Sequence, residues 1–285
     1  MNEDRVRMIE TNRFEDVLQI NMGREKDGQV LYWVSAYLVD GLLIDTGCAH
    51  TALELADFLK DFDASVAVNT HYHEDHVGAN RLLQERFGID IFAHRDSVPL
   101  INQVPELYPY QELVWGYPEP SEVRCIPESI ETDHFHFDVI DTPGHSIGHI
   151  TLVEPDRGWC FTGDLFVSEK PRVIRPEEDV EQIVRSMYRL LELPVSELVL
   201  FTSVHKVVQN GRKALRACIE YLKDVSHQAR RLEEEGHSIE DIVRIIFGGE
   251  DLFPELTDGQ FSSENLVRSA LSGLGVSWTF PKNRS

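Results

Sequence analysis

Residues 71–76 of this chain read His-Tyr-His-Glu-Asp-His, so four side chains that can bind a metal ion fall within six positions. An apolar, β-branched run precedes this motif and apolar side chains at helical spacing follow it, which predicts a strand end on the turn into a helix. Alternation in an extended segment turns His71 and His73 to the same side. The curl into the helix then lets Asp75 and His76 face a neighbouring position. Two imidazoles for one ion, and a carboxylate with an imidazole for a second, suit zinc, iron or manganese.

Length and net charge limit the class of protein. A chain of 285 residues has room for one large domain and a small one. Its formal net charge of −22 repels phosphate backbones and anionic membranes and favours solubility. The charge argues against a nucleic-acid partner and leaves a small-molecule substrate as the expectation. The sequence does not reveal the oligomeric state.

The N-terminal residues and the cysteines bear on the compartment. Residues 1–5 are charged and no apolar run follows them, so no secretory signal is indicated. No uninterrupted apolar stretch is long enough to span a bilayer, the longest candidate lying at residues 30–39. A cytoplasmic protein is therefore expected. Wide spacing of the cysteines argues against a disulfide framework or a cysteine zinc site and predicts buried free thiols at Cys48, Cys125, Cys160 and Cys218.

Hydrophobic periodicity predicts alternating strands and helices followed by a helical tail. Strands are expected at residues 14–20, 30–39, 42–44, 65–70, 89–93, 135–140, 149–153, 159–161 and 197–202. Helices are expected, besides the one after the motif, at residues 51–59, 177–191, 212–235, 238–247 and 263–271. Between residues 98 and 127 periodicity fades while Pro and aromatic residues accumulate, which predicts a long loop. Its aromatic side chains either form the wall of a substrate pocket or pack on the domain surface.

Further candidate site residues follow predicted strands. Asp45 comes directly after one strand, and it either caps the next helix or orients a metal ligand. A Pro-Gly turn presents His145 at a strand end. Asp164 and His205 follow the last two predicted strands. Strand ends therefore carry the candidate ligands throughout the first two thirds of the chain.

In this order, Asp45, the motif at residues 71–76, His145, Asp164 and His205 resemble the motif set of the metallo-β-lactamase superfamily, and the resemblance covers roughly residues 14–220. It implies an α/β (α+β) fold, a four-layer αββα sandwich with metal ions at the edge of the sheets. We accordingly expect a catalytic domain at residues 1–220 and a C-terminal helical extension at residues 221–285.

The same resemblance implies a set of metal ligands. One ion would be held by three histidines, namely His71, His73 and His145. The second would be held by Asp75, His76 and His205. Asp164 would bridge the two ions. Because Asp164 stands where the β-lactam-cleaving relatives with a cysteine ligand have that cysteine, antibiotic hydrolysis is not the first expectation.

The chain departs from the family pattern at the last of these ligands. Relatives usually have Gly-His or Ala-His there, whereas this sequence reads Ser-Val-His-Lys at residues 203–206. The Gln-Asn-Gly-Arg that follows at residues 209–212 is similar to the family's continuation. His205 is therefore kept as an expected ligand.

The implied ligand set predicts a metal-dependent hydrolase with a binuclear site of zinc, or alternatively of iron or manganese. Two divalent ions about 3.5–4 Å apart lower the pKa of a bridging water toward neutrality, and the resulting hydroxide attacks an ester-type substrate. Asp75 is the expected catalytic residue because it can accept or relay a proton. Asp45 is the expected partner of imidazole nitrogens that face away from the metal.

Several substrates are compatible with these residues. A small thioester, as in glyoxalase II-like members of the family, or a lactone is the first expectation. The helical tail is also similar to that of β-lactamase-like endoribonucleases, although it has no basic stripe. An iron-dependent oxygenase similar to persulfide dioxygenases would need only the positions of His71, His145 and Asp164. A binding module with a decayed site is the non-enzymatic alternative, and the complete ligand set argues against it.

Overall fold

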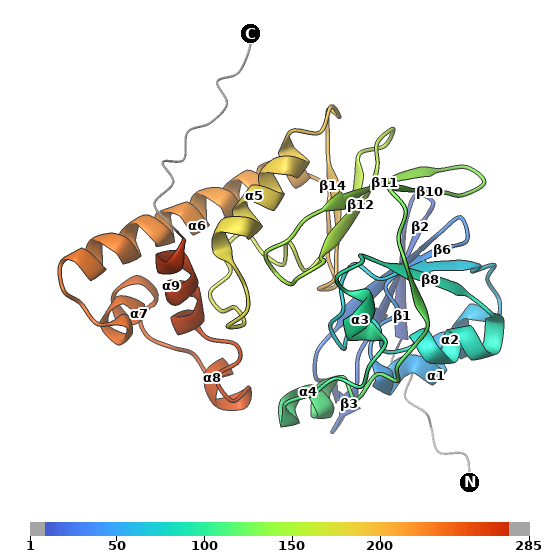
Figure 1. Ribbon diagram of the computed structural model, residues 1–285, viewed down its shortest axis with the longest axis horizontal. Helices are drawn as coiled ribbons and strands as arrows, with labels where there is room; N and C mark the ends of the chain where they lie inside the picture. The colour runs from blue at the N-terminus through green and yellow to red at the C-terminus, as the bar shows by residue number, and fades with distance from the viewer. Residues whose placement is uncertain (1–8, 274–285) are drawn as a thin grey trace.

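The structure, a computed structural model, describes residues 9–273 (Figure 1). The charged N-terminus at residues 1–5 and the end of the predicted extension at residues 274–285 lie outside that range. Within it the chain forms two large β-sheets and a small hairpin, and helices cover the outer faces of the sheets.

The first sheet comes from the N-terminal part of the chain. Its strands lie in the order β1-β2-β5-β6-β7-β8-β9. Their bounds are Ile9–Phe14, Val17–Met22, Val34–Val39, Leu42–Ile44, Val66–Val68, Asp90–Ala93 and Val123–Cys125. Strands β6, β7 and β8 pair in parallel, so their C-terminal ends meet at one edge of the sheet.

The second sheet follows in the order β10-β11-β12-β13-β14-β15. Its strands are Ser129–Glu131, His136–Asp141, Ile150–Glu154, Trp159–Gly163, Val199–Thr202 and Val207–Val208. Strands β13 and β14 pair in parallel, which again brings two C-terminal strand ends together. A separate hairpin joins β3 (Glu25–Lys26) to β4 (Gln29–Val30).

The helices of the described range flank these sheets or follow them. A 3-10 turn, η1 (Ala49–Thr51), leads into α1. The α-helices α1 to α9 span Ala52–Leu59, Asn80–Phe87, Val98–Ile101, Pro109–Val114, Val180–Leu191, Gly211–Glu234, Ile239–Phe247, Phe253–Leu256 and Ser263–Ser272.

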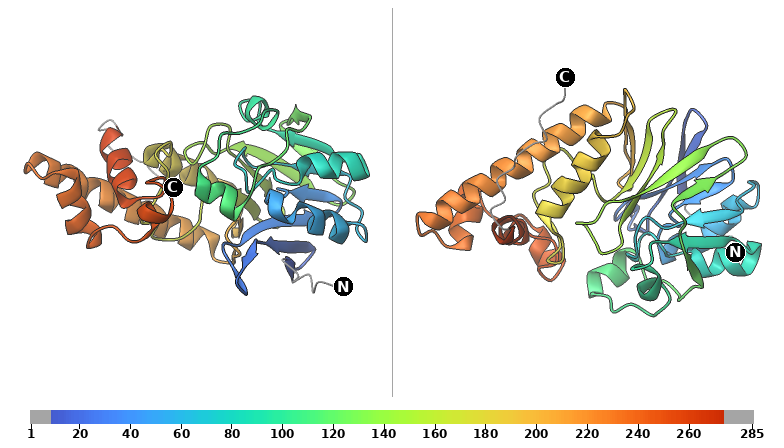
Figure 2. Two further views of the ribbon diagram at one scale, coloured as in Figure 1. Left: turned by 90° about the horizontal axis from the view of Figure 1, so that it is seen from below. Right: turned by 45° about the horizontal axis from the view of Figure 1, so that its top comes forward.

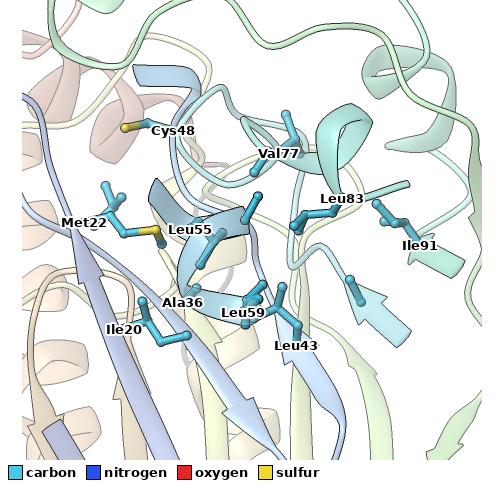
Figure 3. Packing of buried hydrophobic residues seen from close by; sticks show 14 of the residues in the cluster. Ile20, Met22, Ala36, Leu43, Cys48, Leu55, Leu59, Val77, Leu83 and Ile91 are labelled. Carbon is cyan, nitrogen blue, oxygen red and sulfur yellow. The ribbon is translucent and has the colours of Figure 1, made fainter. Parts of the chain in front are cut away.

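Hydrophobic cores separate four layers. The outer face of the first sheet packs on α1 and α2, in the cluster drawn in Figure 3. Aromatic side chains such as Tyr37, Phe137 and Phe161 fill the space between the two sheets. The outer face of the second sheet packs on α5 and α6. The resulting order of helix, sheet, sheet and helix, visible in the right-hand view of Figure 2, confirms the predicted αββα sandwich.

Strand β5 illustrates why these residues form an inner layer. All of its residues are buried. Successive side chains of a strand point to opposite faces, so Ala36 and Leu38 enter the core with α1 and α2 while Tyr37 and Val39 enter the core between the sheets. An apolar run without alternation of polar residues is typical of a strand buried on both faces.

Two strand predictions differ from the structure. The sequence predicts one strand at residues 14–20, but the chain turns at Glu15, whose φ is +50°, and β1 and β2 form a hairpin around it. The strand predicted at residues 30–39 is likewise divided between β4 and β5. At the first of these breaks, two consecutive acidic residues, Glu15 in the left-handed conformation and Asp16, form the turn between the strands.

The predicted loop at residues 98–127 contains regular structure, so that prediction was wrong. It includes α3, α4 and β9, each too short to leave a clear period in the sequence. Tyr110 and Trp115 are buried in the core beside α1 and α2, whereas Tyr108 and Tyr117 are exposed. Two of the aromatic side chains of this region therefore pack in the core, and two lie on the protein surface.

The C-terminal helices extend beyond the sandwich (Figure 1). Helix α6 runs through residue 220, where the boundary between two domains is predicted, and so belongs to both parts. Its first half packs on the second sheet, and its second half forms a small core with α7 and α9. The division at residue 220 stays a prediction.

Two further sequence expectations concern the burial of the cysteine thiols and the lack of a membrane-spanning segment. Cys48, Cys160 and Cys218 are buried and free, but Cys125 on β9 is exposed, contrary to the expectation for all four. Across residues 9–273, none of the helices combines the length and the apolar composition that crossing a membrane requires.

Candidate metal centre

The candidate site lies where strand ends of the two sheets meet. Asp45 follows β6 and the motif at residues 71–76 follows β7, while Asp164 follows β13 and His205 follows β14. The turn between β11 and β12 carries His145. Because parallel strands present their C-terminal ends at the same edge, residues far apart in the sequence gather here.

Three of the predicted ligands converge on one point. His73 Nδ1 lies 3.0 Å from His71 Nε2 and 2.9 Å from His145 Nε2. All three side chains are buried, and their ligand atoms lie within 4.8 Å of one another. Three imidazole nitrogens at such distances can occupy three positions of a tetrahedral metal ion.

A second group shares His71 with the first. His71, His76 and Asp164 also offer ligand atoms within 4.8 Å of one another. Asp164 Oδ1 lies 3.4 Å from His76 Nε2, and its Oδ2 lies 3.4 Å from His145 Nε2. The two oxygens of this carboxylate thus face the two groups. Asp75 Oδ2 lies 3.7 Å from His76 Nε2, beside the second group.

Asp45 contacts the histidines and not the helix that follows it. Its Oδ2 accepts a hydrogen bond from His76 Nδ1 at 2.8 Å, and its Oδ1 accepts one from the Thr70 backbone at 2.7 Å. The Thr70 hydroxyl donates to the same carboxylate and lies 3.1 Å from His71 Nδ1, so it accepts the proton of that ring. Neither η1 nor α1 has a side-chain cap. Of the two roles open from the sequence, the contacts are those of a ligand-orienting residue.

The electrostatics of the site favour a cation. Burial and the neighbouring His76 lower the pKa of His71 well below its usual value, which keeps the ring neutral. Burial opposes protonation of His76, but the carboxylates of Asp45 and Asp75 outweigh it and raise the pKa. Burial alone would raise the pKa of Asp164, but His145 and His76 together lower it well below its usual value, so the carboxylate is ionised. Carboxylates that attract positive charge at His76, beside an imidazole that stays neutral at His71, are the kinds of donor that divalent metals bind.

Several buried side-chain atoms of the described residues lack a hydrogen-bond partner, and one of them, His76 Nε2, faces the carboxylates of the candidate site. Within residues 9–273, His76 Nε2 is buried and unpaired, although its Nδ1 is held by Asp45. The nitrogen faces the carboxylates of Asp75 and Asp164. An unpaired buried polar atom costs roughly 1–3 kcal/mol, and a metal ion at this point would remove that cost. The residues present therefore fit a metal.

His205 lies outside both groups. Its ring packs on Trp33, with centroids 5.5 Å apart, and its backbone N–H donates to Ser35 Oγ at 3.1 Å. Its φ is +62°, a left-handed conformation that is rare for a non-glycine residue. Ser203, two residues earlier, donates a hydrogen bond to Asp164. The segment thus reaches the site, while the imidazole does not join the other ligands.

Sequence reasoning missed four polar residues around the ligands. They are Thr70, Glu74, Arg175 and Glu178. Glu178 Oε2 accepts a hydrogen bond from His145 Nδ1 at 3.0 Å. Arg175 is buried and forms an ion pair with Glu74 at 3.2 Å. Arg175 and Glu178 stand at the start of the helix predicted at residues 177–191, where charged residues are ordinarily solvated, so only their buried contacts distinguish them.

His149 is a further buried histidine beside the candidate ligands. Its Nδ1 lies 2.9 Å from the Thr142 hydroxyl. Its ring lies 5.1 Å from that of His71, and burial lowers its pKa to about 3. The neutral ring therefore packs against the candidate ligands without joining them.

The chain belongs to the metallo-beta-lactamase superfamily. The family's sequence model matches residues 34–202, which include every candidate ligand except His205. Together with the relatives below, this makes the protein an enzyme, a metal-dependent hydrolase of that superfamily. The match ends within the second sheet, before the C-terminal helices.

Individual relatives are distant. The chain is 30% identical over 154 residues to hydroxyacylglutathione hydrolase GloC of Haemophilus influenzae. The aligned region covers 51% of this chain and 70% of that protein. Its fold is similar to a metallo-beta-lactamase family protein from Thermus thermophilus, TTHA1429, with a TM-score of 0.64 and 18% identity, over 90% of this chain and 92% of that chain. TTHA1623, solved in a di-iron-bound form, aligns with 27% identity and a TM-score of 0.51, over 65% of this chain and 94% of that one.

Proposed function

We propose that this protein hydrolyses a small thioester using two divalent metal ions at the candidate centre. The observation that carries the proposal is the convergence of His71, His73 and His145 next to a second group that shares His71. The name of the Haemophilus influenzae relative, a hydroxyacylglutathione hydrolase, supports a thioester as the substrate. A lactone is the second ester-type candidate.

The proposed ligands divide between the two ions. The first ion would take His71, His73 and His145. The second would take Asp75, His76 and His205, with Asp164 between the ions. The two oxygens of Asp164, each 3.4 Å from a histidine of a different group, support that bridging role. Left-handed backbone at His205 supports its inclusion, because strained residues persist mainly at functional sites.

When bound, two such ions activate water at neutral pH and polarise the substrate carbonyl. The residues of the chain supply orientation and proton transfer. Asp45 holds the Nδ1 proton of His76 and, through Thr70, that of His71, so that both Nε2 atoms present lone pairs. Asp75 is the proposed proton acceptor. Burial, opposed by His76, raises the pKa of its carboxyl to about 6.

Zinc is the proposed metal, with iron or manganese as alternatives. Histidine and carboxylate ligands serve all three, and the di-iron-bound form of TTHA1623 supports iron as the main competitor. Metal content measured on purified protein, followed by removal and stepwise reconstitution with each metal, decides between them.

The test is a hydrolysis panel with and without a chelator. A glutathione thioester and a homoserine lactone are compared with single-stranded RNA and a chromogenic β-lactam. We expect thioester turnover that the chelator abolishes and that added zinc restores. Turnover of RNA or β-lactam alone would overturn the substrate class, and a metal-loaded protein inactive on all four compounds would overturn the proposal as a whole.

A further inference from the structure

The segment in front of α5 touches the metal centre at two points. Arg175 forms an ion pair with Glu74, the residue between His73 and Asp75 in the motif. Glu178 accepts a hydrogen bond from His145 Nδ1 at 3.0 Å. Both Arg175 and Glu178 are buried. Residues 174–180, called here the brace segment, therefore contact one proposed ligand of the first ion, His145, and the motif that carries another, His73.

The Glu178 carboxylate is fixed on both oxygens. Oε2 faces His145, and Oε1 accepts a hydrogen bond from the Arg175 backbone N–H at 2.8 Å. With its Nδ1 proton donated to Glu178, His145 can offer only Nε2 as a lone pair. That nitrogen is the one that lies 2.9 Å from His73 Nδ1. The hydrogen bond thus selects the tautomer that binds metal.

The turn that carries His145 rests on the same segment. The Asp179 backbone N–H donates to Gly144 O at 2.8 Å. A Cβ on Gly144, whose φ is +134°, would lie 2.4 Å from Ile183 N, so only glycine permits this close approach of the turn to the start of α5. His145 and Glu178 are therefore held at a fixed separation by backbone contacts as well.

Helix α9 of the C-terminal extension holds the brace segment in turn. The Ser269 hydroxyl donates to Glu178 O at 2.8 Å and accepts from the Val180 backbone N–H at 2.9 Å. Asn265 Nδ2 donates to Ile174 O at 3.1 Å, and Ile174 also forms an isolated β-bridge with Ser262. Polar contacts from α9 reach both ends of the segment, and α9 lies against α5 and α6 in Figure 1.

We propose that Glu178 is the positioning residue for His145 and that the C-terminal extension maintains it there through Ser269. This inference rests on the proposed metal-dependent function. It assigns a role to a part of the chain outside the matched family region, namely keeping one metal ligand in its binding tautomer. Loss of a partner that orients a metal-binding histidine typically weakens metal binding about 10–100-fold.

The experiment measures zinc affinity of the full chain by competition with a chromophoric chelator. In Glu178→Gln a single amide oxygen replaces two acceptor oxygens, so either the His145 Nδ1–H or the Arg175 backbone N–H that fixes the side chain loses its acceptor, and His145 is no longer held in its binding tautomer by a fixed partner. We expect one of the two zinc equivalents to bind about 10–100-fold more weakly. Ser269→Ala should weaken the same equivalent to a smaller extent. Ser272→Ala is the matched control, because Ser272 is exposed on the same helix and bonds only within it.

A second comparison separates positioning from general destabilisation. Glu178→Gln is repeated in a His145→Ala background, where a positioning residue has nothing left to orient and should add no further loss. An equal further loss there, or unchanged affinity in Glu178→Gln with native thermal unfolding, would overturn the inference. If the unmodified protein binds no zinc and no iron, the proposed function fails first, and the inference with it.

Discussion

Two buried carboxylate–imidazole pairs orient the candidate ligands, and they differ in how the chain assembles them. Asp45 binds His76 at 2.8 Å, and Glu178 binds His145 at 3.0 Å. Asp45 and His76 follow neighbouring parallel strands, β6 and β7, within one sheet. The pair of Glu178 and His145 instead joins a turn of the second sheet to the start of α5, with α9 behind it.

The two carboxylate–imidazole pairs depend on different parts of the fold. Strand pairing alone brings Asp45 to the motif, so the first pair forms whenever the first sheet forms. The second pair requires α5 to dock on the turn at residues 143–145 and α9 to dock on α5. We infer that the His76 side of the centre belongs to the sandwich itself, whereas the His145 side also depends on the C-terminal helices.

The largest effect is expected from His71→Ala, because His71 is a proposed ligand of the first ion and its ligand atom also lies within the second group, beside His76 and Asp164. The variant should lose both metal ions and all thioester turnover, more than the roughly 10–100-fold effect of an orienting partner. Metal analysis after gel filtration measures this, with His237→Ala, remote from the centre, as the control. Retention of one tightly bound ion would mean that the two groups are independent.

His205→Ala should lower metal content from about two ions to about one per chain if the ring completes the second group. The ring must then leave or share its contact with Trp33. Trp33→Phe is the companion variant, since it preserves an aromatic surface and should keep both ions. Unchanged stoichiometry in His205→Ala would remove His205 from the site.

Asp45→Asn should weaken both zinc equivalents about 10–100-fold, because Asp45 orients His76 directly and His71 through Thr70. Glu178→Gln should weaken only one. Chelator competition on the two variants side by side tests the comparison between the pairs. An effect of Asp45→Asn confined to one equivalent would show that the Thr70 contact does not transmit to His71.

The smallest effect concerns an exposed pair of the same chemistry. His134 Nδ1 donates to Asp40 Oδ1 at 2.9 Å, and the His134 side chain is 75% exposed. The hydrogen bond to Asp40, followed by the charge of that carboxylate, raises the pKa of His134 above 6.5. Burial opposes the shift at Asp40, but hydrogen bonds from Thr132 and His134 lower its pKa below 3.8.

The raised pKa of His134 stabilises the folded protein below pH 6.5, and this stabilisation is lost as the pH rises through the folded-state pKa. The lowered pKa of Asp40 stabilises the folded protein above pH 3.8 and is lost as the pH falls through the folded-state pKa. Asp40→Asn should therefore lower the denaturant midpoint slightly at both pH values, and more at pH 5.5, where His134 is charged, than at pH 8, where only the hydrogen bonds to the Asp40 carboxylate remain. Urea unfolding at pH 5.5 and pH 8 measures the difference. An equal loss at both pH values would assign the effect to something other than the ion pair.

Much of the fold was predictable because its signals are local. Apolar runs on buried strands, as in β5, and the amphipathic pattern of α5 each arise from one short stretch. The predictions failed where regular elements are only a turn or two long, as in α3 and α4, or where a left-handed turn residue such as Glu15 divides a predicted strand. Such features depend on contacts that no periodicity records.

For the site, the sequence by itself determined the types of the candidate ligands, their order, and the place of Asp45, because each follows a strand in a recognisable motif. The tertiary structure decided which of them meet: His71, His73 and His145 converge, Asp164 faces both groups, and His205 packs on Trp33. It also decided that Glu178 is part of the centre. An acidic residue at a helix start is ordinarily solvated, and only the docking of α5 and α9 buries this one against a histidine.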